Sequence, residues 1–175
     1  MDPFTYFLAF TRLAPVQCVL LGHPETTGIP TIDYFLSSDL METPDSPNHY
    51  TETLVPLKGI QTDYARPDMP TSPTPLEDFG FSSQQHLYVC PMTLFKIHPE
   101  FDHALAEILE RDPLAQIVLF RYQKTELHHR LLKRFEKTIP SGLERLCFLP
   151  WSSLDDFFSI LMQAHVVLDT FHFSG

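Results

Sequence analysis

Four short apolar runs recur in the second half of the chain, and amphipathic segments separate them. The runs lie at 86–90 (HLYVC), 116–120 (QIVLF), 145–149 (RLCFL) and 165–169 (HVVLD). None of them alternates polar and apolar residues, which is typical of strands that are covered on both faces of a parallel sheet. The pattern therefore predicts an α/β fold with right-handed βαβ crossovers in residues 86–170.

Three helices are predicted between these strands, at about 99–111, 124–138 and 152–164. Ser152 and Asp155 have the spacing of a capping box at the start of the third helix. Apolar residues at helical spacing predict the buried faces: Phe101, Leu105, Ile108 and Leu109 in the first helix, Leu127, Leu131 and Phe135 in the second, and Leu154, Phe157, Phe158 and Leu161 in the third.

The first 60 residues predict part of a separate lobe. A helix is expected at 3–13, and strand-like runs lie at 16–21, 31–38 and 50–57. Residues 61–85 differ in composition, because four prolines fall within ten residues, a density that neither a helix nor a central strand tolerates. We therefore expect three parts: residues 1–60, a proline-rich linker at 61–85, and a second lobe at 86–175.

Charge and cysteine content exclude several classes of protein. The formal charge is −10, and −8 of it lies in residues 1–85, which argues against general nucleic-acid binding. No apolar run approaches the roughly 20 residues of a membrane span, and no secretory signal is recognisable. Cys18, Cys90 and Cys147 each lie in an apolar run without metal-ligand spacing. We expect buried, reduced thiols in a cytoplasmic protein that binds neither membrane nor nucleic acid.

Lys96 is the leading candidate for a ligand contact. It follows the predicted strand 86–90 within the stretch LYVCPMTLFK, and ligands gather where the strands of such sheets end. The hypothesis is that its ammonium meets phosphate; the alternative is a solvated lysine. Thr93 lies in the same turn, where its hydroxyl could instead bond its own backbone.

The loop that follows run 16–21 is a second candidate. It reads GHPETTG, and it places His23 between a glycine and a proline. Thr26, Thr27 and Gly28 could offer hydroxyl and N–H donors to a sugar, or they could simply make the turn.

Three segments give the chain a family resemblance. APVQCVLLGHPETTGIPTIDYFLSSDL resembles the late N-lobe of bacterial O-GlcNAc transferase/SPINDLY-like glycosyltransferases. CPMTLFKIHPEFDHALAEILERDPLAQIVLF resembles the start of their C-lobe, and LPWSSLDDFFSILMQAHVVLDTFHFSG resembles the stretch that leads into their nucleotide site. The match follows the family's order and spacing over nearly the whole chain.

The resemblance implies a GT-B fold of two Rossmann-like lobes, a UDP-sugar donor, a protein acceptor, and neither a metal nor another cofactor. It implies that Lys96 neutralises the donor phosphates and that Thr93 lies near the uracil or phosphate. It also implies a sugar-facing loop comprising His23, Thr26, Thr27 and Gly28. No catalytic residue of the family has a counterpart in these 175 residues.

The resemblance implies a partial catalytic region that is inactive alone. The alternatives are a non-catalytic remnant or interaction module, and a small nucleotide-binding α/β protein unrelated to sugar transfer. A metal site is not expected, because His98 and His103 are five residues apart and His128 and His129 are adjacent. The basic residues Arg130, Lys133, Arg134 and Lys137 are expected to form a solvated helix face.

Overall fold

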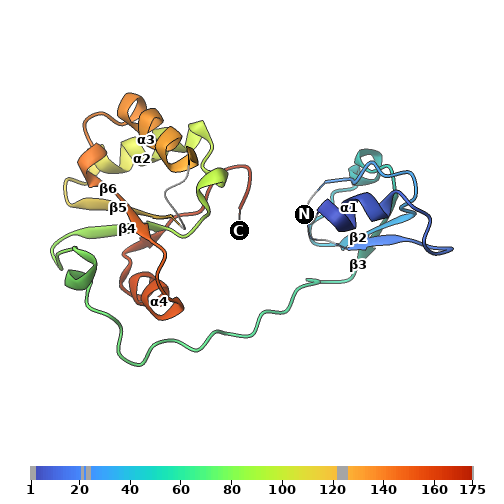
Figure 1. Cartoon of the computed structure of the whole chain (residues 1–175), viewed down its shortest axis with the longest axis horizontal. Helices are drawn as coiled ribbons and strands as arrows, with labels where there is room; N and C mark the ends of the chain where they lie inside the picture. The colour runs from blue at the N-terminus through green and yellow to red at the C-terminus, as the bar shows by residue number, and fades with distance from the viewer. Residues whose placement is uncertain (1–2, 21, 23–24, 122–125, 175) are drawn as a thin grey trace. The chain divides into compact units, whose positions relative to one another are not determined.

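The computed structural model describes residues 3–20, 22, 25–121 and 126–174. The chain forms two compact units, Met1–Arg66 and Pro67–Gly175 (Figure 1). The division falls inside the predicted linker. No helix among the described residues is long and apolar enough to cross a membrane.

The first unit is built on a small parallel sheet with strand order β1-β2-β3. Its elements are α1 (Pro3–Ala9), β1 (Cys18–Leu20), β2 (Tyr34–Ser38), the 3₁₀ helix η1 (Ser46–His49) and β3 (Thr53–Leu57). Helix α1 ends four residues before the predicted 3–13 boundary. Residues 12 and 13 have other partners instead. The Arg12 guanidinium donates to the Asp33 carboxylate, and the Leu13 N–H donates to Gln17 Oε1 four residues later.

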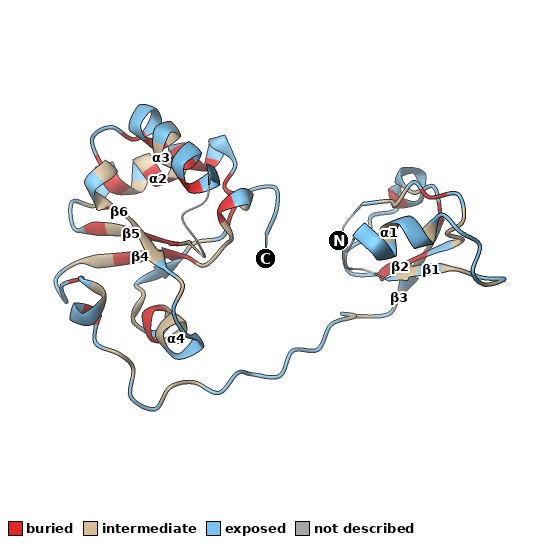
Figure 2. Ribbon diagram, in the orientation of Figure 1, coloured by how far each residue is buried: buried red, intermediate tan, exposed pale blue. Residues whose placement is uncertain are grey.

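The core of the first unit is small. Phe35 is buried against the ring of Tyr50, and Ile29 is buried nearby in the chain. Helix α1, as described, buries no residue, and its Phe4 and Phe7 side chains are exposed (Figure 2). Cys18 is also exposed, and Cys147 of the second unit is only partly buried, so the expectation that all three thiols are buried is confirmed for Cys90 alone. Strand β1 pairs only with β2 among the described strands, which leaves one side of it without a partner.

The second unit is the predicted parallel α/β layer. Its strands run in the order β6-β5-β4-β7, and every pair is parallel. The elements are η2 (Leu76–Phe79), β4 (His86–Cys90), η3 (Leu94–Lys96), α2 (Pro99–Arg111), β5 (Ala115–Arg121), α3 (Glu126–Thr138), η4 (Leu143–Arg145), β6 (Leu146–Pro150), α4 (Leu154–Gln163) and β7 (Val166–Val167). The α/β fold class is therefore confirmed.

Both faces of this sheet are covered, as its apolar strands predicted. Helices α2 and α3 lie on one face and α4 on the other (Figure 1). Successive strand residues point to opposite faces, and the core divides accordingly. Ile117 and Leu119 pack with α2 and α3, whereas Val118 and Phe120 pack with Ile160 of α4.

The second half of the predicted linker is not a spacer. Leu76 and Phe81 are buried in the core that also holds Ile160. The Thr74 N–H donates to Ser159 Oγ at 3.0 Å, and Gln163 Nε2 donates to the Thr74 carbonyl at 2.9 Å. Proline density predicted correctly that this segment forms no α-helix or strand, but the apolar residues between the prolines help to cover the sheet face.

Several helix details were predicted wrongly. The side chain that caps α4 is Ser153, which accepts from the Asp156 N–H at 3.1 Å, so the cap lies one residue later than the predicted Ser152–Asp155 pair. Leu154 then lies in the exposed first turn, and Ile160 is buried in the helix body. In α3, Leu127 is exposed and His128 is buried in its place. Shifts of one residue move a side chain by about 100° around a helix, which is enough to exchange faces.

Candidate functional site

Strand order places a topological switch point between β4 and β7. From β4 the chain moves to β5 and β6 on one side, and it then returns to place β7 on the other side of β4. The Leu168 N–H donates to the Val89 carbonyl at 2.8 Å, which continues the pairing beyond β7. Ligands of open α/β sheets bind at the carboxyl ends of such strands. The candidate site is therefore the pair of segments that follow β4 and β7.

Lys96 is the cation at this edge of the sheet. It ends η3, the short helix after β4, and its Nζ donates to the Ser174 carbonyl at 2.8 Å. The same ammonium lies 4.7 Å from the centre of the Phe173 ring. Residues that are 78 positions apart thus meet where the strand order predicts a ligand crevice.

The turn after β7 is organised by its own side chains. Asp169 Oδ1 accepts from the Thr170 N–H at 2.8 Å, and Asp169 Oδ2 accepts from the Ser174 hydroxyl. The buried Thr170 hydroxyl donates to the Phe173 carbonyl at 2.8 Å. These bonds fix the carbonyl that faces Lys96. Sequence reasoning did not identify this turn as a partner of Lys96, although Asp169 at the end of a predicted strand was a usable signal.

Thr93 lies three residues before Lys96, at the start of η3. Its hydroxyl is buried and has no hydrogen-bond partner among the described residues, and it does not cap η3. The alternative in which this hydroxyl bonds its own backbone is therefore not seen. The donor-binding role of Thr93 stays a prediction.

The candidate sugar-facing loop belongs to the first unit, and there it surrounds a carboxylate. Thr26 Oγ1 donates to Glu52 Oε2 at 2.6 Å, and the Thr27 N–H donates to Glu52 Oε1 at 2.9 Å. The Thr27 hydroxyl donates to the same Oε1. Gly28 has a φ of 64°, a left-handed conformation that explains a glycine at this turn. His23 lies outside the described residues.

Glu52 was not identified from the sequence, because a lone glutamate in the run YTETLVPL has no distinguishing spacing. Burial alone would raise the pKa of its carboxyl group, but the hydrogen bonds from Thr26 and Thr27 outweigh that effect and lower the pKa to about 2. Both hydroxyl groups are committed to Glu52 in this structure. Their assignment to the donor sugar, and that of Gly28, stays a prediction.

A pocket of about 490 Å³ lies at the carboxyl end of β6. Trp151 and Phe157 contribute aromatic walls, with ring centres 5.2 Å apart, and Asp156 and Ser152 contribute polar edges. Because all strands of this sheet are parallel, their carboxyl ends share one edge. The pocket and Lys96 therefore belong to the same edge of the second unit. No sequence pattern singled out Trp151 as a site residue.

Comparison with known proteins shows what this arrangement is similar to. The chain is 32% identical over 170 residues to "Probable UDP-N-acetylglucosamine--peptide N-acetylglucosaminyltransferase SPINDLY" of Oryza sativa subsp. japonica, across 94% of this chain and 18% of that protein. A solved structure, a mutant of the O-GlcNAc transferase of Thermobaculum terrenum, matches with a TM-score of 0.73 at 30% identity, across 97% of this chain and 32% of that one. The chain belongs to the O-GlcNAc transferase/SPINDLY-like family.

Other comparisons agree with this membership. The "UDP-glucose:protein N-beta-glucosyltransferase" of Actinobacillus pleuropneumoniae is 28% identical over 180 residues, across all of this chain and 28% of that protein. No model of a known protein family matches. The chain thus corresponds to an O-GlcNAc transferase-like glycosyltransferase region of GT-B fold, and it spans about a fifth of the length of the SPINDLY relatives.

Proposed function

We propose that this chain supplies donor contacts of a UDP-sugar-dependent protein glycosyltransferase, with Lys96 as the cation that meets the diphosphate. The observation that carries the proposal is the position of the Lys96 ammonium at the β4/β7 switch point, 2.8 Å from the Ser174 carbonyl. Nucleotide phosphates bind at such points of open α/β sheets. The names of the relatives supply the substrate class, a UDP-sugar and a protein.

The contacts of Lys96 explain how it would act. A neutral carbonyl and an aromatic face now hold the ammonium. A diphosphate oxygen would replace the carbonyl with a charge-assisted hydrogen bond, which is roughly twice as strong as a neutral one. During transfer, negative charge grows on the departing UDP, so a fixed ammonium stabilises the transition state more than the ground state. This chemistry requires no metal ion.

The pocket beside Trp151 gives the nucleotide a second contact. Its aromatic walls can stack on a planar base, and its polar edges can bond ring nitrogens and carbonyls. We assign the base to this pocket and the diphosphate to Lys96. We further propose that these 175 residues bind the donor without transferring its sugar, since the match covers 18% of the rice relative.

Titration with UDP in a calorimeter tests the proposal. We expect micromolar binding to the unmodified chain, a loss of about tenfold or more in Lys96→Ala, and unchanged binding in Lys133→Ala. Lys133 is an exposed lysine of α3, so this control removes the same charge from the same unit. Equal affinity for UDP and ADP, absence of binding, or equal affinity of wild type and Lys96→Ala would reject the assignment. Release of UDP from a UDP-sugar would contradict the proposed lack of transfer.

A second function is an interaction module that binds no nucleotide. The observation that favours it is the exposed aromatic side of α1, where Phe4 and Phe7 face solvent. Contiguous exposed apolar surface often marks contact with another protein. The same titration separates the two functions, because an interaction module gives no heat with UDP.

A further inference from the structure

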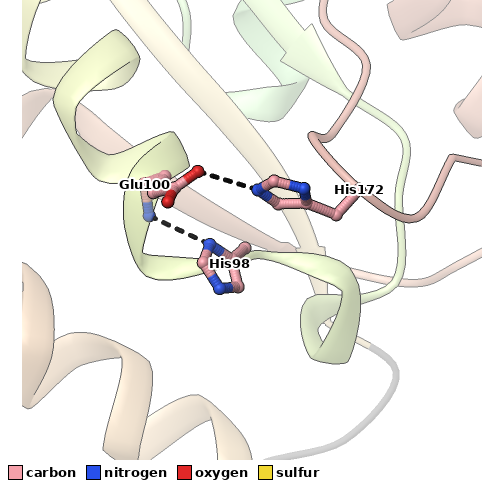
Figure 3. A group of neighbouring side chains, drawn as sticks. All are labelled: His98, Glu100 and His172. Atoms are coloured by element: carbon pink, nitrogen blue, oxygen red, sulfur yellow. Dashed lines mark hydrogen bonds and ion pairs between the residues drawn. The ribbon is translucent and has the colours of Figure 1, made fainter.

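Two histidines and a glutamate meet on the surface of the second unit, outside the donor contacts described above. His98 and Glu100 lie at the start of α2, and His172 lies in the turn after β7 (Figure 3). One ligating atom from each of the three side chains lies within 4.8 Å of the other two. The sequence did not predict this group, because His172 lies 72 positions from Glu100 along the chain.

The three side chains already contact one another. His172 Nε2 lies 2.8 Å from Glu100 Oε2, and the Glu100 N–H donates to His98 Nδ1 over a long 3.3 Å. The two imidazole rings meet edge to face with centres 4.7 Å apart. His172 adopts a φ of 67°, a left-handed conformation that side chains rarely take. The His172 imidazole therefore contacts the start of α2 from a turn in which its own backbone is in an unfavourable conformation.

This donor set has the chemistry of a transition-metal site. Imidazole nitrogens with one carboxylate suit Zn²⁺ and its neighbours, whereas Mg²⁺ and Ca²⁺ prefer oxygen ligands alone. Tetrahedral zinc with bonds of about 2.0–2.1 Å requires ligands about 3.4 Å apart. All three side chains are exposed, so rotation about their side-chain bonds can close the difference.

We propose that His98, Glu100 and His172 bind one Zn²⁺-like ion, with water completing the coordination. The ion replaces the His172–Glu100 hydrogen bond and the long hydrogen bond to His98. It links the start of α2 to the turn after β7. Lys96 lies in η3, two residues before His98, and Ser174 lies two residues after His172, so the bound metal would hold together the two sides of the switch point.

Zinc titration of the untagged 175-residue chain, against a chromophoric chelator, tests the site. We expect one equivalent of Zn²⁺ to bind in the micromolar range or tighter, with Mg²⁺ failing to compete. His172→Ala should weaken this equivalent by about tenfold or more, since even the loss of an outer partner of a metal ligand costs that much. His129→Ala is the matched control, because it removes an exposed histidine from α3 of the same unit and should leave affinity unchanged.

A second measurement distinguishes binding at this site from binding of zinc to other histidines or thiols. Co²⁺ replaces Zn²⁺ and reports its ligands through visible absorption, so the spectrum of the wild type should change in Glu100→Gln and in His98→Ala. Circular dichroism of the metal-free variants checks that each one folds. Lack of a bound equivalent in the wild type, or equal affinity of wild type and His172→Ala, would overturn the proposal.

Discussion

Arg134 of α3 binds the buried carboxylate of Asp102 in α2 through two hydrogen bonds. Arg134 Nε and Nη2 donate to the two carboxylate oxygens at 2.9 and 2.8 Å. The side chain of Asp102 is 1% exposed, against 27% for Arg134. Nη2 also donates to the Ile97 carbonyl at 3.0 Å, one residue after Lys96. Arg134 thus fixes the segment that carries Lys96. The expectation of a solvated side chain was therefore wrong for Arg134, whereas Arg130, Lys133 and Lys137 are exposed as predicted.

Replacement of Arg134 by alanine should destabilise the second unit strongly. The change leaves the buried Asp102 charge with Thr138 as its remaining described side-chain partner, and an uncompensated buried charge costs about 3–5 kcal/mol. Trp151 is the single tryptophan of the chain and lies in this unit. Urea unfolding followed by its fluorescence should therefore show a large fall in midpoint.

Arg130→Ala provides the comparison for this experiment. Arg130 bonds Glu126 one helical turn away, and both side chains are 75% exposed. Such a pair contributes about 0.3–0.5 kcal/mol. If the two variants lose similar amounts of stability, the Asp102 carboxylate is not the buried charge that the structure shows.

Low pH should destabilise the first unit, because it protonates the Glu52 carboxylate. Its carboxyl pKa falls from an ordinary 4.5 to about 2 on folding. A depressed folded-state pKa gives stability that is present above pH 4.5 and is lost as the pH falls toward 2. The contribution at neutral pH is on the order of 1–2 kcal/mol after allowance for solvent screening. Hydrogen exchange of β2 and β3 amides, followed by NMR, should show protection falling across this window.

Glu52→Gln should remove the contribution of Glu52 to the pH dependence of amide protection. It should also lower the protection of these amides at neutral pH. Glu25→Gln is the matched control, because Glu25 is exposed in the same loop. Other carboxylates of this unit, Asp33 and Glu42, also have a lowered pKa, so some acid sensitivity should remain. A Glu52→Gln profile identical to that of the wild type would contradict the assignment.

Ser153→Ala should uncap α4. The Ser153 hydroxyl accepts from the Asp156 N–H, and loss of such a cap costs about 1 kcal/mol. The Asp156 amide should lose its protection from hydrogen exchange, and Ser153→Asp should restore it. Ser152→Ala should have a smaller effect on that amide, because Ser152 contacts the Asp156 carboxylate and not its N–H.

Gly142→Ala should destabilise the second unit by crowding. An added Cβ would lie 2.8 Å from Leu109 Cδ1 and 3.3 Å from Leu109 Cβ, and Leu109 is buried. Overpacking of this kind costs about 1–3 kcal/mol. Ser141→Ala, at the exposed neighbouring position, should change the urea midpoint little. A Gly142→Ala, Leu109→Val double variant should recover part of the loss, because it removes bulk at the point of contact.

The parallel sheet of the second unit could be predicted because its strands are apolar on both faces. Val118 and Ile117 are neighbours in sequence but pack on opposite sides, and only a doubly covered strand needs both to be apolar. Helix boundaries followed from similar local patterns, and α2 was predicted at the range observed. Side-chain burial was less predictable: the one-residue difference between Ser152 and Ser153 as the cap, and the burial of His128, depend on how each helix is rotated against the sheet.

The order of apolar runs along the chain determined the strands, the intervening helices and the position of Lys96 just beyond a strand, because these depend on side chains a few residues apart. The tertiary structure decided that β7 joins β4, that Ser174 faces Lys96, that Glu52 receives the threonine hydroxyls, and that His172 meets Glu100. Each of these contacts joins residues more than 20 positions apart. Local periodicity cannot predict contacts between residues so far apart in the sequence, because these contacts form only when strand order and packing bring the segments together.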